Sequence, residues 1–129
     1  MKPAAAGPDR ARNMQRERQR RDRLAAKELR QRFPQFTSLR LDFVFSDADA
    51  QPPAPQSIVL HPPARAYFVY PCPYGGCNGE LDLAANVDHI AQQGEDRADG
   101  HVKCSGERHG RHGKAPCDLH IEYSIAVGK

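Results

Sequence analysis

Four cysteines constrain this chain more than any other feature, because they flank two turns and can share one metal ion. Their spacing is Cys-x4-Cys, a long insert, and then Cys-x12-Cys, at Cys72, Cys77, Cys104 and Cys117. Two of them begin nearly the same tetrapeptide, Cys-Asn-Gly-Glu and Cys-Ser-Gly-Glu. Such a turn aims backbone N–H groups at a sulfur, and we expect its glycine to adopt a positive φ. The pattern predicts two knuckles that hold one structural Zn²⁺.

Length and composition limit the size of the core. The chain has 129 residues, a hydrophobic share of 39%, no Trp, 11 prolines and 10 glycines. A core this small usually needs an additional cross-link, which a metal ion bound to four thiolates provides. We predict an α+β fold that is mainly β, with a basic N-terminal arm and helix over residues 1–36 and a small antiparallel β domain over residues 37–129.

The chain shows no sign of secretion. No apolar run approaches the roughly 20 residues that span a bilayer, and residues 1–25 lack the apolar segment of a signal peptide. We expect a cytoplasmic protein with no membrane contact. In a reducing compartment four cysteines favour a metal site over two disulfides, with buried cysteines that bind no metal as the remaining alternative.

One helix is predicted from Pro8 to Phe33, since this stretch is rich in helix formers and has no internal Gly or Pro. Its apolar residues occur late, at spacings near three and four, and continue beyond its end: Leu24, Ala25, Ala26, Leu29, Phe33 and Phe36. Only the second half therefore has a face that can dock on the domain. The first half, residues 9–23, is polar on every side and should project into solvent or meet a partner.

After Pro34 the hydrophobic period changes to two, which is typical of strands. Strands are predicted over residues 39–45, 57–60, 65–70, 80–83 and 118–126. Asn86 is predicted to cap a short helix over 87–93, which an acidic loop follows at 94–100. Cys104 and Cys117 should lie at the base of a hairpin whose tip is 108–114. The body is therefore expected to be an assembly of β-hairpins around a metal.

With a cysteine pair in each of two hairpins, the chain resembles the zinc-ribbon family. The resemblance covers about residues 66–127 and rests on Cys72, Cys77, Cys104 and Cys117. It implies a small β domain with one structural zinc, of a kind that often works in transcription, translation and complex assembly.

Histidines offer a rival ligand set. His101 precedes Cys104 by three residues, His120 follows Cys117 by three, and His109 and His112 lie in the predicted tip. His120 has the opposite parity to Leu119 and Ile121, so it should point out of the last strand. The two tip histidines are more simply solvated loop residues. We expect the four cysteines to bind the metal.

No catalytic constellation accompanies the cysteines. Four thiolates close a tetrahedral site, whereas catalysis at a metal needs an open position. The sequence has no Gly-rich phosphate loop, no His-Glu-x-x-His and no nucleophile elbow. We expect neither an enzyme nor a small-molecule substrate.

The basic charge belongs to the N-terminal part. Residues 1–40 carry 12 Lys/Arg against 4 Asp/Glu, a balance of +8, which leaves −5 for residues 41–129. This polarity predicts sequence-independent contact with nucleic acid or a ribonucleoprotein surface. The alternatives are an adaptor that docks on an acidic protein partner, and a solvated arm in which Glu17 and Asp22 pair with nearby arginines. The candidate residues are Arg12, Arg16, Arg18, Arg20, Arg21 and Arg23 in the helix, with Arg108, Arg111 and Lys114 in the second hairpin.

Overall fold

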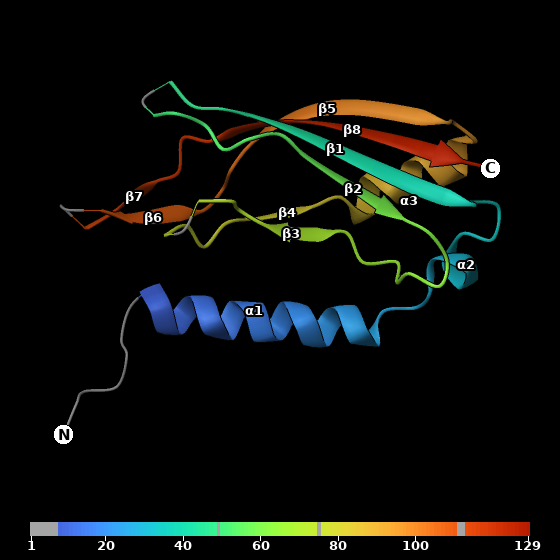
Figure 1. The fold of residues 1–129 in the computed structure, drawn as a ribbon, viewed down its shortest axis with the longest axis horizontal. Coiled ribbons are helices and arrows are strands. Elements are labelled where there is room, and N and C mark those ends of the chain that lie inside the picture. Colours follow the sequence, from blue (N-terminus) through green and yellow to red (C-terminus); the bar gives the residue numbers. More distant parts are fainter. Residues whose placement is uncertain (1–7, 49, 75, 111–112) are drawn as a thin grey trace.

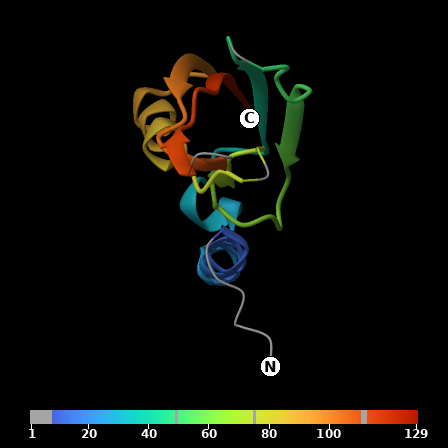
Figure 2. The same cartoon turned by 90° about the vertical axis from the view of Figure 1, so that its left-hand side faces the viewer.

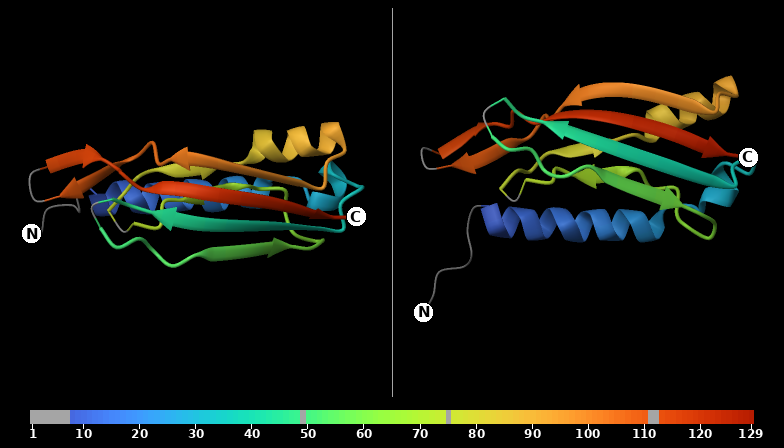
Figure 3. Two further views of the ribbon diagram at one scale, coloured as in Figure 1. Left: turned by 90° about the horizontal axis from the view of Figure 1, so that it is seen from above. Right: turned by 45° about the horizontal axis from the view of Figure 1, so that its top comes forward.

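A curved, four-stranded antiparallel sheet organises the fold, in the order β2-β1-β8-β5. The structure is a computed structural model, and it describes residues 8–48, 50–74, 76–110 and 113–129. Figure 3 shows the four strands side by side, with β1 and β8 the longest. The predicted α+β, mainly β class is confirmed. The strands are β1 (Ser38–Ser46), β2 (Gln56–Leu60), β5 (Arg97–Lys103) and β8 (His120–Gly128).

Alternation along the central strands separates the two faces of the sheet. Leu39, Leu41, Phe43 and Phe45 of β1 are buried, whereas Val44 is 50% exposed. The register pairs β1 with β8 along its whole length. In β1 a period of two therefore turns one face to the core and the other toward water, as its sequence predicts, and in β8 Ile121 and Ile125 are buried.

Three elements cover the inner face of the sheet (Figure 2). They are helix α2 (Leu29–Arg32), helix α3 (Ala84–Gln93) and the hairpin of β3 (Val69–Pro71) with β4 (Glu80–Asp82). Leu29, Phe68, Val87 and Ile90 join the inward residues of the sheet in one buried cluster. The hydrophobic core is therefore centred between the sheet, α2 and α3.

The opposite end of the molecule is built from hairpins. There β6 (Glu107–Gly110) pairs with β7 (Gly113–Pro116), as predicted for the second hairpin. Figure 1 shows this hairpin extending beyond the sheet, at the end far from α2. The four cysteines lie where it meets the loop that joins β3 to β4.

The single helix predicted from Pro8 to Phe33 is wrong. Helix α1 ends at Ala25, and the chain becomes extended before α2 begins at Leu29. Backbone groups of this break pair with a distant loop: Leu29 N–H donates to Ala64 O, and Ala66 N–H donates to Lys27 O. These tertiary hydrogen bonds outweigh helix propensity, which is a weak local preference.

No helix in the described ranges is long and apolar enough to cross a membrane.

Two further predictions fail around α3. The helix begins at Ala84, where Asp82 Oδ1 accepts the Ala84 N–H, and Asn86 does not cap it. Instead Asn86 Nδ2 donates to the Tyr123 hydroxyl. The acidic loop expected over 94–100 ends early, because β5 begins at Arg97. The predicted strand over 65–70 is also shorter, since β3 begins only at Val69.

Candidate metal centre and the basic helix

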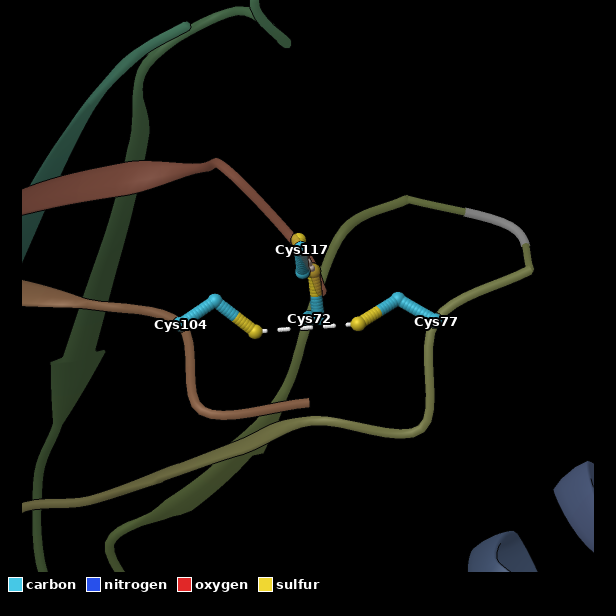
Figure 4. Close-up of side chains that lie close together, drawn as sticks. All are labelled: Cys72, Cys77, Cys104 and Cys117. Carbon is cyan, nitrogen blue, oxygen red and sulfur yellow. Dashed lines mark hydrogen bonds between the residues drawn. The ribbon is translucent and has the colours of Figure 1, made fainter. Parts of the chain in front are cut away.

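The four cysteine sulfurs converge on one point between the hairpins. All four Sγ atoms lie within 4.8 Å of one another and all four residues are buried. Cys77 Sγ is 3.6 Å from Cys104 Sγ, and Cys72 Sγ is 4.0 Å from Cys117 Sγ. Four sulfurs at about 2.3 Å from a zinc ion form a tetrahedron with edges of about 3.8 Å. The sulfur cluster, seen in Figure 4, therefore has the dimensions of a tetrahedral metal site.

The repeated tetrapeptides make equivalent turns. Gly79 N–H donates to Cys77 Sγ at 3.3 Å, and Gly106 N–H donates to Cys104 Sγ at 3.4 Å. A backbone N–H aimed at sulfur stabilises the negative charge of a thiolate. The predicted pair of knuckles is therefore present, with one such hydrogen bond in each.

The reason for glycine in these turns differs from the predicted one. Among described residues positive φ occurs only at Gly94 and Gly113, outside the knuckles. A Cβ at Gly79 would lie 2.3 Å from Cys104 Sγ, and one at Gly106 would lie 2.4 Å from Gly79 N. The two turns cross in contact, so glycine is required for close approach and not for a left-handed backbone.

Chemistry and geometry both suit a bound metal cation. Burial raises the pKa of the Cys72 thiol above its usual range. Without a cation the Cys72 thiol is therefore kept neutral, whereas a metal ion converts its cysteine ligands to thiolates. Four thiolates at tetrahedral spacing fit zinc and leave no coordination position open. The cysteines that sequence spacing singled out are the residues that the fold brings together.

The histidines lie apart from this cluster. Within the described ranges the four cysteines are the only such group, and no histidine joins them. His120 Nδ1 is 3.2 Å from His101 Nε2, and their rings stack across β8 and β5. His112 and the side chain of His109 lie outside the described residues.

Helix α1 packs against the first knuckle through polar side chains. Gln15 Nε2 donates to Asn78 O at 2.8 Å, and Gln19 Nε2 donates to Glu80 Oε2 at 2.9 Å. Arg18 pairs with the same carboxylate. Gln19 is only 6% exposed. The first half of the helix therefore has a docking face, although its sequence lacks an apolar stripe.

Glu80 remains a carboxylate in this contact. Burial by itself would raise the pKa of Glu80, but hydrogen bonds from Gln19, Arg18 and Gln15 outweigh that effect and lower the pKa. Because the ionised form accepts these bonds, the attachment of α1 depends on charge as well as on shape.

The predicted arginines of α1 differ in their contacts and exposure. Arg18 faces the knuckle and also pairs with Asp22 at 3.9 Å, as predicted for a helical i,i+4 pair. Arg12 is half-buried. The exposed members are Arg16, Arg20, Arg21 and Arg23. α1 runs along the outside of the molecule, beneath the β3–β4 hairpin (Figure 1).

In the second hairpin Arg108 is tied to the protein itself. Its guanidinium lies 4.4 Å from the centre of the Tyr74 ring and 3.8 Å from Asp47 Oδ2. Burial, and then the hydrogen bond to Asp47, raise the pKa of Tyr74 to about 12, so its hydroxyl stays protonated and donates. Lys114 is exposed, and Arg111 lies outside the described residues.

Sequence reasoning missed the residues that fix these arginines. Gln15 and Gln19, four apart among charged neighbours, were a usable signal for the inner face of α1. Asp47 and Tyr74 gave no local signal, because they meet only in the folded chain. Comparison with protein-family models, with curated proteins and with solved structures finds no match for this chain.

Proposed function

We propose that this is a non-enzymatic, zinc-ribbon-like binding protein of the cytoplasm, which contacts phosphates of nucleic acid or of a ribonucleoprotein surface through α1. The zinc supports the fold and takes no part in chemistry. Four buried cysteines support this assignment, because as thiolates on one tetrahedral metal ion they would leave no place for a substrate.

The observation that carries the phosphate contact is the way α1 is held. Its inner face uses glutamines and one arginine to bind the knuckle, and Arg16, Arg20, Arg21 and Arg23 remain exposed. Arg20 and Arg21 border a shallow outward surface with Leu24. An array of exposed guanidinium groups on a fixed helix is suited to phosphates, whose recognition needs positive charge and no base contact.

This mode of binding predicts low sequence specificity. The described residues that line the outward surface include no aromatic ring on which a base could stack: they are Glu17, Arg20, Arg21, Leu24 and Ala25. Base-edge readout also needs side chains that enter a groove of the duplex in a fixed register. The contact is therefore expected to follow phosphate density and salt.

Salt dependence tests the proposal directly. Affinity for a random DNA duplex, measured by fluorescence anisotropy, should fall linearly in log salt with a slope of about −0.9 per phosphate neutralised. The double variant Arg20→Gln/Arg21→Gln should reduce that slope by up to about two units on every duplex sequence, because each lost contact removes one released counterion.

The matched control removes two exposed arginines from the sheet. Arg40 in β1 and Arg97 in β5 pair with Asp42 and Asp99. The variant Arg40→Gln/Arg97→Gln removes the same net charge as the α1 variant, and it should leave the slope of affinity against log salt unchanged. Equal losses in both double variants would show a general charge effect. No affinity for duplex or single strands at low salt would remove the phosphate contact altogether.

A second candidate function is an adaptor that docks on an acidic protein. A groove beside α1 favours it, because arginines line this groove together with aliphatic side chains. Phosphate binding by itself would not require the aliphatic side chains that line this groove.

A further inference from the structure

A groove of about 650 Å³ separates α1 from strands β2 and β3. Figure 2 shows α1 end-on below the sheet, with β2 at one edge of the sheet. We call it the α1–β2 groove. It is not part of the metal centre, since none of the four cysteines lines it.

The aliphatic side chains of the groove are a continuation of the core. Ile58 and Leu60 of β2 are half-buried, and they lie opposite Leu41 and Leu39 of β1, which are fully buried. Paired residues share a face of the sheet, so Ile58 and Leu60 point to the same side as the core. The covering hairpin leaves them accessible, and they form an apolar floor with Val69.

Positive charge surrounds this floor. Arg16, Arg20 and Arg23 of α1 line the groove, together with Arg65 from the segment between β2 and β3. Arg65 is held in place by donating from Nη1 to Ala26 O at 3.0 Å. No Asp or Glu is among the described residues that line the groove. A ligand that is both anionic and apolar therefore complements it.

Two strand edges border the same groove. In the part of the chain that the structure describes, β2 pairs only with β1, and β3 pairs only with β4. Because β1 occupies one side of β2, the backbone N–H and C=O groups of its other edge make no strand pairing within the described ranges. An exposed edge of this kind is a template for an added strand.

These observations favour a peptide over a nucleic acid strand. Single-stranded nucleic acid needs aromatic platforms for its bases. Among the described residues that line the groove, Tyr67 is the one ring that could serve, since Tyr70 packs edge-on against Phe43 with ring centres 5.5 Å apart. Aliphatic side chains and open strand edges instead match an extended peptide, whose alternate side chains point to opposite faces.

We infer that the α1–β2 groove binds an extended acidic peptide of a partner protein, added as a strand at the free edge of β2. Its apolar side chains lie on Ile58 and Leu60, and its Asp or Glu side chains pair with Arg16, Arg23 and Arg65. The inference rests on the second candidate function above, to which it gives a site. Its failure leaves the phosphate contact of the outward arginines standing.

A labelled peptide tests this inference on the full chain. The probe is a peptide of about ten residues that alternates Glu and Val, and the control peptide has the same composition in two blocks, Glu then Val. Anisotropy should show tighter binding of the alternating peptide. The double variant Arg16→Glu/Arg23→Glu should weaken that binding about tenfold or more, because it replaces attraction with repulsion.

The control variant is Arg10→Glu/Arg21→Glu, which reverses two exposed α1 arginines that do not line the groove. It should bind the peptide nearly as well as the wild-type chain. Hydrogen exchange adds a readout that needs no variant: the amides of residues 56–60 should gain protection when the peptide is bound.

Four results would overturn the inference. Equal binding of the block peptide would mean that charge alone explains the binding. Tighter binding of a single-stranded oligothymidine, lost in Arg16→Glu/Arg23→Glu, would make the groove a nucleic acid site. Peptide binding without protection of 56–60, or no binding at low salt, would exclude strand addition at β2.

Discussion

At Gly79 and Gly106 the two knuckles approach so closely that neither turn can carry a side chain. The sulfur of Cys104 and the backbone of Gly106 surround the site where a Cβ of Gly79 would lie. The repeated tetrapeptide in the sequence pointed to these turns, but their crossing could not be predicted from it. A contact between residues 27 positions apart depends on the fold that brings the hairpins together.

Gly106→Ala should therefore damage the metal centre as well as the fold. Its Cβ would lie 2.5 Å from Gly79 Cα and 2.8 Å from Cys77 Sγ, and such overpacking costs about 1–3 kcal/mol of unfolding free energy. Thermal unfolding and retained zinc measure the two effects. Ser105→Ala, at an exposed position of the same turn, is the control. An unchanged melting temperature and zinc content in Gly106→Ala would contradict the crossing of the knuckles.

The break between α1 and α2 gives two neighbouring leucines opposite environments. Leu29 is 0% exposed, whereas Leu24 is 60% exposed beside the groove. Leu29→Ala should lower the free energy of unfolding by about 2–5 kcal/mol, because it leaves a cavity in the core. Leu24→Ala should change it by no more than about 0.5 kcal/mol. Denaturant titration of both variants measures these free energies of unfolding. Comparable losses of stability in the two variants would mean that a continuous helix packs through both positions.

At the scale of elements the sequence was most informative where hydrophobic alternation is strict. The strands at 39–45 and 118–126 were predicted closely, because apolar side chains recur at every second position and pack on the core. Prediction failed where tertiary contacts replace local preference: the break before Leu29 is fixed by a loop near residue 65, and β5 was hidden by the polar sequence at its start. Gly100 fits that strand because it lies against the Tyr123 ring, a contact that no local pattern encodes.

The whole molecule is held together differently at its two ends. Around α2 and α3 the sheet is covered by large apolar side chains such as Leu29, Phe68 and Ile90. At the other end the β3–β4 loop and the β6–β7 hairpin meet mainly through the buried cysteines and backbone contacts such as Asn78 N–H to Glu107 O at 3.3 Å. A metal bound only by the folded chain would stabilise that end strongly, since structural zinc binding is worth roughly 10–16 kcal/mol in small domains. The position of α1 depends on the structure of that end of the molecule, because α1 docks on the first knuckle.

The metal content of the full chain, purified under reducing conditions and measured by elemental mass spectrometry, tests this account most directly. Tetrahedral sulfur sites take zinc or iron, so the measurement also identifies the metal. We predict close to one zinc per chain, and none in a variant with all four cysteines replaced by serine. A folded, reduced protein that contains no metal, or one that contains iron in place of zinc, would contradict it.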